Sequence, residues 1–242
     1  MQAIDRRQMA TRTYTTRDHD PEAGPIGAAE PRRGAISIRT LALGGALAGG
    51  IGIAGAIADA VAIASTDVSE DIWSYPWSGA TFVATTLLFA VLHALCFGLL
   101  LGLRRSGLTG PTRGVGVAMA GTVVVFLAEF ASIPARDFDV ESTTVTAVII
   151  PMFALGGLLA AVGLIVAGRA TLRARRWDGW GRFTPLGLGI AALLPTLLGP
   201  TDLFPYGFAI YGAALLALGA ALASARLSSV SIPLNQSARQ VK

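Results

Sequence analysis

Residues 40–64 read TLALGGALAGGIGIAGAIADAVAIA and contain a single charged side chain, Asp59. Residues 80–103 read ATFVATTLLFAVLHALCFGLLLGL and contain no Asp, Glu, Lys or Arg. A helix needs roughly 20 apolar residues to cross the hydrocarbon core of a bilayer. Each of these two runs is therefore long and apolar enough to form a membrane-spanning helix.

Four further apolar runs follow, and together the runs predict an all-α polytopic membrane helical bundle. The six expected transmembrane helices cover residues 40–64, 80–103, 114–133, 145–168, 183–199 and 206–225. The fifth is short and contains Pro195, so taken alone it could be a re-entrant segment. The composition agrees with a membrane protein, because only 14% of the 242 residues are charged and a soluble domain carries roughly 25%. This composition excludes a soluble globular enzyme and a disordered chain.

The basic residues alternate between the connecting segments, and this alternation sets the expected orientation. Every Lys and Arg except Arg136 lies in the tail 1–39, in the loops after the second and fourth apolar runs, or at the C-terminal end. Basic residues are enriched in cytoplasmic loops of membrane proteins. We therefore expect a multi-pass protein of the cell inner membrane with both termini in the cytoplasm, and this orientation requires residues 183–199 to cross the membrane fully.

The chain divides into one membrane domain and two polar ends. Residues 1–39 predict a disordered cytoplasmic tail, residues 40–226 a six-helix transmembrane domain, and residues 227–242 a cytoplasmic C-terminal tail. The net charge of +4 comes from loops beside apolar runs rather than from a folded basic surface. We therefore expect the lipid bilayer as a partner, and no nucleic acid.

Small residues recur at every fourth position along residues 40–64. Residues four apart share one face of a helix, and small side chains there let a second helix approach closely. We therefore expect helix one to be central in the bundle and to offer a face to a homo-oligomer or to a membrane-protein partner. Gly45 and Gly49 form a GxxxG pair that fits packing within the chain equally well. The two rows are Ala42, Ala46, Gly50, Ala54, Ala58, Ala62 and Gly44, Ala48, Gly52, Ala56, Ala60, Ala64.

Three polar residues lie inside expected spans, namely Asp59, His93 and Glu129. By helical rise, both acids lie roughly 6–9 Å below the outer boundary of the membrane. At that depth they could line an outward-facing site for a cation, a proton or another ligand, or they could reach the headgroups or form a structural ion pair. Arg136, the one basic residue expected outside, is the candidate partner of Glu129. For His93, a hydrogen bond to a neighbouring helix is a simpler interpretation than a proton relay.

The sequence offers no recognisable set of catalytic or metal-binding residues. One intramembrane histidine cannot form a bis-histidine haem site, and His93 with Cys96 gives too few ligands for zinc. A lipid-handling enzyme would need a nucleophile or a metal cluster. We therefore expect no cofactor, no metal and no enzymatic activity.

The basic inner loop Arg175-Arg176-Trp177-Asp178-Gly179-Trp180 lies between two apolar runs. In this layout, residues 40–226 resemble uncharacterised six-helix integral membrane proteins of GC-rich bacteria, a resemblance that implies no activity. The sequence favours a non-enzymatic membrane subunit or accessory protein that packs through small-residue helix faces. The alternative is a small transporter or ion-coupled carrier that uses Asp59 and Glu129 within the membrane.

Overall fold

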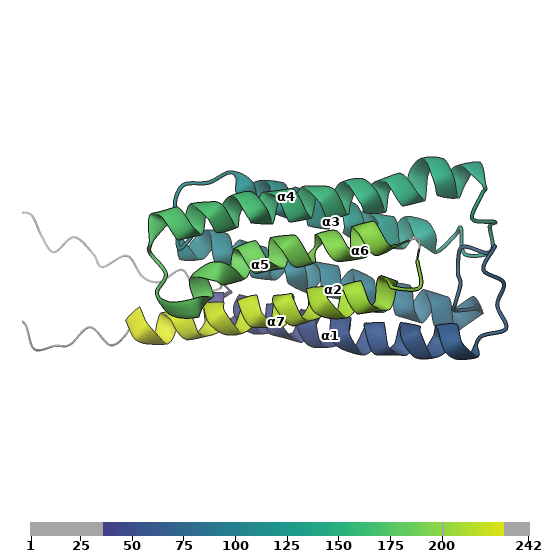
Figure 1. Ribbon diagram of the computed structural model, residues 1–242, viewed down its shortest axis with the longest axis horizontal. Coiled ribbons are helices and arrows are strands. Elements are labelled where there is room, and N and C mark those ends of the chain that lie inside the picture. The colour runs from purple at the N-terminus through teal and green to yellow at the C-terminus, as the bar shows by residue number, and fades with distance from the viewer. Residues whose placement is uncertain (1–35, 200, 230–242) are drawn as a thin grey trace, which may run out of the picture. The chain divides into compact units, whose positions relative to one another are not determined.

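Five long helices and four short helical elements make up the part of the chain that the computed structural model describes, residues 36–199 and 201–229 (Figure 1). The long helices are α1 (Ile38–Ser65), α2 (Gly79–Ser106), α3 (Gly114–Ser132), α4 (Ile150–Ala174) and α7 (Phe204–Ser229). The short elements are a π-helix η1 (Val145–Ile149), a 3-10 helix η2 (Gly179–Phe183), α5 (Thr184–Ala191) and α6 (Leu193–Leu198).

These elements confirm the expected all-α fold with six spans. Six helical segments are long and apolar enough to cross a membrane, and α5 and α6 together with η2 supply the fifth. The fourth extends to Ala174, beyond the expected end at residue 168, because the long arginine side chains near its end can reach out of the apolar layer. The proposed tails lie mostly outside the described residues, and α1 already begins at Ile38.

The fifth span is broken at Ala192, between α5 and α6. Pro195 has no backbone N–H to donate to the carbonyl group four residues earlier, so the regular ladder of the helix is interrupted there. The backbone N–H of Ala192 donates to the Leu188 carbonyl oxygen at 2.8 Å, which closes the last turn of α5. The span is thus a chain of short helices rather than one continuous helix.

The helices pack in a closed order around the bundle. α1 contacts α2, α2 contacts α3, α3 contacts α4, α4 contacts α5 and α6, and these contact α7, which returns to α1. Among the described helices α1 touches only α2 and α7, so the expectation that it is central is wrong. The reason is the up-and-down topology, which brings the first and last helices side by side (Figure 1).

The small residues of α1 serve its contact with α7. A Cβ atom at Gly49 would lie 2.5 Å from both the Gly212 carbonyl oxygen and the Leu216 nitrogen, so the two backbones touch. A Cβ atom at Gly219 would likewise meet the backbone of α1, at 2.6 Å from the Ala46 nitrogen. The contact positions on α1 follow steps of three and four residues. A strict four-residue row drifts around a helix, and for this reason Ala54 and Ala58 of the expected row are exposed.

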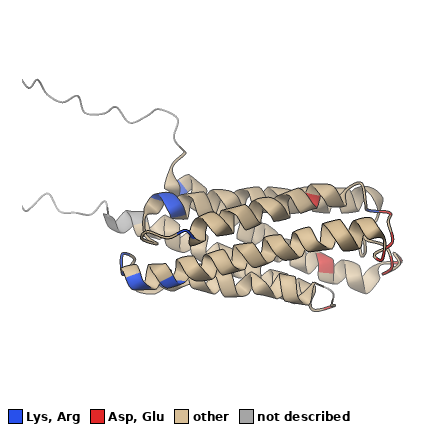
Figure 2. Cartoon of the chain, turned by 90° about the horizontal axis from the view of Figure 1, so that it is seen from above, with Lys and Arg blue, Asp and Glu red and all other residues tan. Residues whose placement is uncertain are grey.

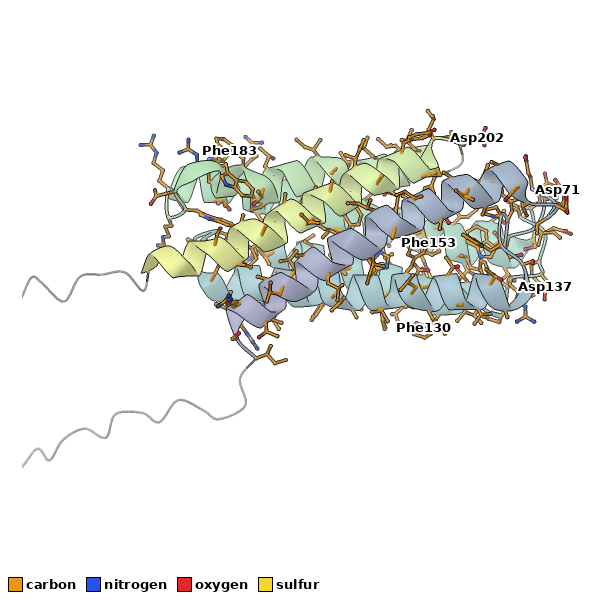
Figure 3. The ribbon with its side chains drawn as sticks, turned by 90° about the horizontal axis from the view of Figure 1, so that it is seen from below. Asp71, Phe130, Asp137, Phe153, Phe183 and Asp202 are labelled. Atoms are coloured by element: carbon orange, nitrogen blue, oxygen red, sulfur yellow. The ribbon has the colours of Figure 1, made fainter. Side chains whose placement is uncertain are left out.

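The loops at one end of the bundle are joined by backbone hydrogen bonds. Trp73 N–H donates to the Phe138 carbonyl oxygen at 2.9 Å, and Val140 N–H donates to the Asp71 carbonyl oxygen at 2.7 Å. This end, the acidic end, carries Asp71 and Asp137, and Phe183 lies toward the opposite end (Figure 3). The arginine-rich end is defined by the loops 107–113 and 175–183, and Figure 2 shows the separation of charge along the bundle.

Candidate functional site

Asp59, His93 and Glu129 come from α1, α2 and α3 and are all buried. Their exposed fractions are 5%, 8% and 7%, so none of the three side chains faces lipid or reaches a headgroup layer. Each lies on the inward face of its helix. The structure therefore places all three intramembrane candidates among the packed helices.

His93 and Glu129 contact each other between α2 and α3. The Nδ1 atom of His93 lies 3.4 Å from Oε1 of Glu129 and 2.8 Å from the carbonyl oxygen of Phe89. A carbonyl oxygen can only accept, so Nδ1 carries a hydrogen and Nε2 is the ring nitrogen that can accept a proton. The hydrogen bond of His93 thus goes to a carbonyl group of its own helix and not to a neighbouring helix as expected, while the acid of α3 lies in close contact with the same nitrogen atom.

Asp59 is bound by a tryptophan from the loop that follows α1. The Nε1 atom of Trp77 donates a hydrogen bond to Oδ1 of Asp59 at 2.8 Å. This bond fixes the carboxyl group of Asp59 on the inward face of α1. Within the described residues, however, no group of three His, Cys, Asp or Glu side chains is arranged to hold a metal ion.

Arg136 does not pair with Glu129, so that expectation is wrong. Its Nε atom lies 3.1 Å from Oδ2 of Asp137, and both side chains are substantially exposed. The Arg136 carbonyl oxygen accepts a hydrogen bond from Ser74 N–H, which holds this residue in the loop at the acidic end. The arginine is thus fixed outside the helices, where its side chain remains in the loop layer.

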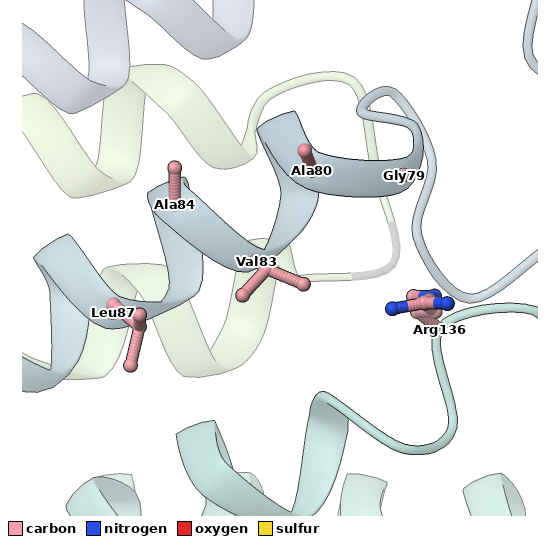
Figure 4. Close-up of a pocket in the computed structure, with 6 residues that line it drawn as sticks. All are labelled: Gly79, Ala80, Val83, Ala84, Leu87 and Arg136. Atoms are coloured by element: carbon pink, nitrogen blue, oxygen red, sulfur yellow. The ribbon is translucent and has the colours of Figure 1, made fainter.

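Arg136 instead borders a pocket of about 460 Å³ on the outer face of α2 (Figure 4). The buried residues Asp59, His93 and Glu129 do not line it. The residues that do are Gly79, Ala80, Val83, Ala84, Leu87 and Arg136.

A second buried polar contact continues from His93 along α2. The Sγ atom of Cys96 lies 3.5 Å from the hydroxyl oxygen of Tyr211 on α7. The sequence does not single out Tyr211 as a residue of the site. The spacing of His93 and Cys96 by three residues puts both side chains on one face of α2, and this spacing indicates that Cys96 lies beside His93.

Comparison with models of protein families, with curated proteins and with solved structures finds no match to this chain.

Proposed function

We propose that the protein is a small transporter of the bacterial inner membrane that carries protons, in which His93, Glu129 and Asp59 bind the transported proton. The observation that carries the proposal is the buried contact of 3.4 Å between His93 Nδ1 and Glu129 Oε1. Ionisable side chains inside a membrane are costly, and those that are retained commonly mark proton or ion pathways.

The geometry supports a proton transfer between the two side chains. A proton that binds Nε2 of His93 converts the ring to imidazolium. Its Nδ1 proton can then leave the Phe89 carbonyl oxygen, to which it is hydrogen-bonded, and pass to Oε1 of Glu129. The products are a neutral imidazole and a neutral carboxylic acid, so the step leaves no separated charges in the low-dielectric interior. Asp59 adds a second buried carboxyl group, on α1, that can also hold a proton.

The contacts that α1 makes within the chain weaken the accessory-subunit interpretation that its small residues suggested. Gly49 meets Gly212 and Leu216, so much of the small-residue face is used within the chain. One observation still favours an accessory role as the second candidate. Ala54 and Ala58 remain exposed at four-residue spacing, and a partner helix could approach them closely. Co-purification in mild detergent tests this candidate, and a monomer without a partner would contradict it.

Proton flux into vesicles tests the carrier proposal. The full chain is reconstituted in proteoliposomes that contain a trapped pH-sensitive dye, and a potassium diffusion potential drives protons inward. We expect the wild type to acidify the lumen, and Glu129→Gln and Asp59→Asn to reduce influx to the rate of protein-free vesicles. Asp202→Asn, which changes an exposed acid, is the matched control and should retain influx.

Two outcomes would overturn the carrier proposal. One is wild-type influx no faster than that of protein-free vesicles. The other is influx that persists at the wild-type rate in the Glu129→Gln variant.

A further inference from the structure

A groove between α5 and α7 opens at the arginine-rich end of the bundle. Its volume is about 340 Å³, and its lining is almost entirely apolar. Such a lining suits a hydrocarbon chain better than a polar ligand. Residues that form it include Trp180, Phe183, Gly187, Leu188, Ala214 and Ala217.

The space in the groove depends on small residues between two large aromatic side chains. A Cβ atom added at Gly187 would point into open space. Apart from the neighbouring residues and the backbone of the same helix, no heavy atom of the described residues would lie within 4 Å of it. Trp180 and Phe183 are 59% and 50% exposed and stand beside this open position. A larger side chain at Gly187 would therefore fill the groove without displacing its neighbours.

A positive charge lies directly beside the groove. The guanidinium carbon of Arg182 is 4.8 Å from the centroid of the Phe183 ring, which lines the groove. Among the described residues Arg182 forms no salt bridge, and the acid present in the adjoining loop is Asp178. Figure 3 shows Phe183 near the end of the bundle that carries the arginines.

We propose that this groove binds one acyl chain of an anionic phospholipid, and that Arg182 binds its phosphate group. The apolar groove fits the acyl chain of such a lipid. Arg182, which forms no salt bridge among the described residues, fits its phosphate group. Basic residues near the membrane surface attract anionic lipids, and tryptophan is favoured at the headgroup level. The pocket beside Arg136 lacks this combination, because Asp137 neutralises that arginine.

Native mass spectrometry of the full chain in mild detergent tests the site. Equal amounts of phosphatidylglycerol and phosphatidylcholine are added, and the lipids that stay bound are counted. We expect the wild type to retain phosphatidylglycerol preferentially and Gly187→Leu to lose this bound lipid. Gly116→Leu is the matched control, since Gly116 is also an exposed helical glycine with open space around it, and it should retain the lipid.

A second variant separates the charge from the groove. Arg182→Gln should still bind lipid but should retain phosphatidylglycerol and phosphatidylcholine equally, whereas Arg113→Gln should keep the wild-type preference. Wild-type retention of phosphatidylglycerol in Gly187→Leu would overturn the proposal. If Gly187→Leu fails to fold, a wild-type preference in Arg182→Gln would overturn it instead.

Discussion

The indole nitrogen of Trp77 donates a 2.8 Å hydrogen bond to the carboxyl group of Asp59, across the loop that joins α1 to α2. The bond gives a buried acid a fixed neutral donor and draws the loop against the side of α1. Trp77 therefore holds one of the two acids of the proposed proton site in place.

Replacing Trp77 by Phe should destabilise the protein by about 1–3 kcal/mol, because the substitution leaves a buried carboxyl group without its donor. The measurement is the unfolding midpoint in detergent. Trp73→Phe is the matched control, since the buried Nε1 atom of Trp73 has no hydrogen-bond partner within residues 36–199 and 201–229, and no bond is lost. Equal destabilisation by the two variants would show that the bond to Asp59 contributes nothing.

Gly49→Ala should destabilise the bundle by about 1–3 kcal/mol, because the added methyl group forces α1 and α7 apart. The neighbouring Gly50 is the control, since a Cβ atom there would meet nothing within 4 Å. Gly50→Ala should leave stability unchanged or raise it by up to about 1 kcal/mol through helix propensity. Unfolding curves of both variants in the same detergent check the prediction, which fails if the two have the same midpoint.

His93 and Glu129 should be coupled in a double-mutant cycle. His93→Leu alone leaves Glu129 buried without its partner and should cost about 1–3 kcal/mol. The double variant His93→Leu, Glu129→Leu replaces both members by apolar groups and should be less destabilised than the sum of the single variants. Additive effects in unfolding experiments would contradict a direct interaction between the two side chains.

Engineered cysteines at Asp67 and Asp178 should react with a membrane-impermeant thiol reagent from opposite sides of the membrane. Asp67 is exposed in the loop after α1 at the acidic end, and Asp178 is exposed in the loop at the arginine-rich end. The native Cys96 is buried and should stay unlabelled in intact cells. Labelling of both positions from the same side would contradict the proposed threading.

The six spans could be predicted because a bilayer imposes a length and an apolar composition on each crossing. The position of α1 could not be predicted in this way. Small residues indicate that some helix approaches closely, but only the register between α1 and α7 shows that Gly49 meets Gly212. Pro195 predicted that the fifth span would be irregular. It did not predict that the helix would be broken at Ala192.

The residues of the candidate site could be selected from the sequence, but their pairing could not. His93 lies about 21 Å of helical rise from the start of α2, whereas Glu129 lies about 5 Å from the end of α3. Their contact therefore requires α2 to project well beyond α3, and no pattern within either helix reports this stagger. The bond from Trp77 to Asp59 crosses a loop, so helical spacing could not reveal it.

The hydrogen bonds between the loops around Trp73 and Phe138 have a mechanical consequence. They join the α1–α2 hairpin to the α3–α4 hairpin at the acidic end. At the arginine-rich end the chain itself joins the same two hairpins through residues 107–113, and Arg176 donates a hydrogen bond to the Gly107 carbonyl oxygen at 3.4 Å. The two hairpins are therefore tied at both extremities, so any motion that separates them must bow the helices between the ties instead of parting either end.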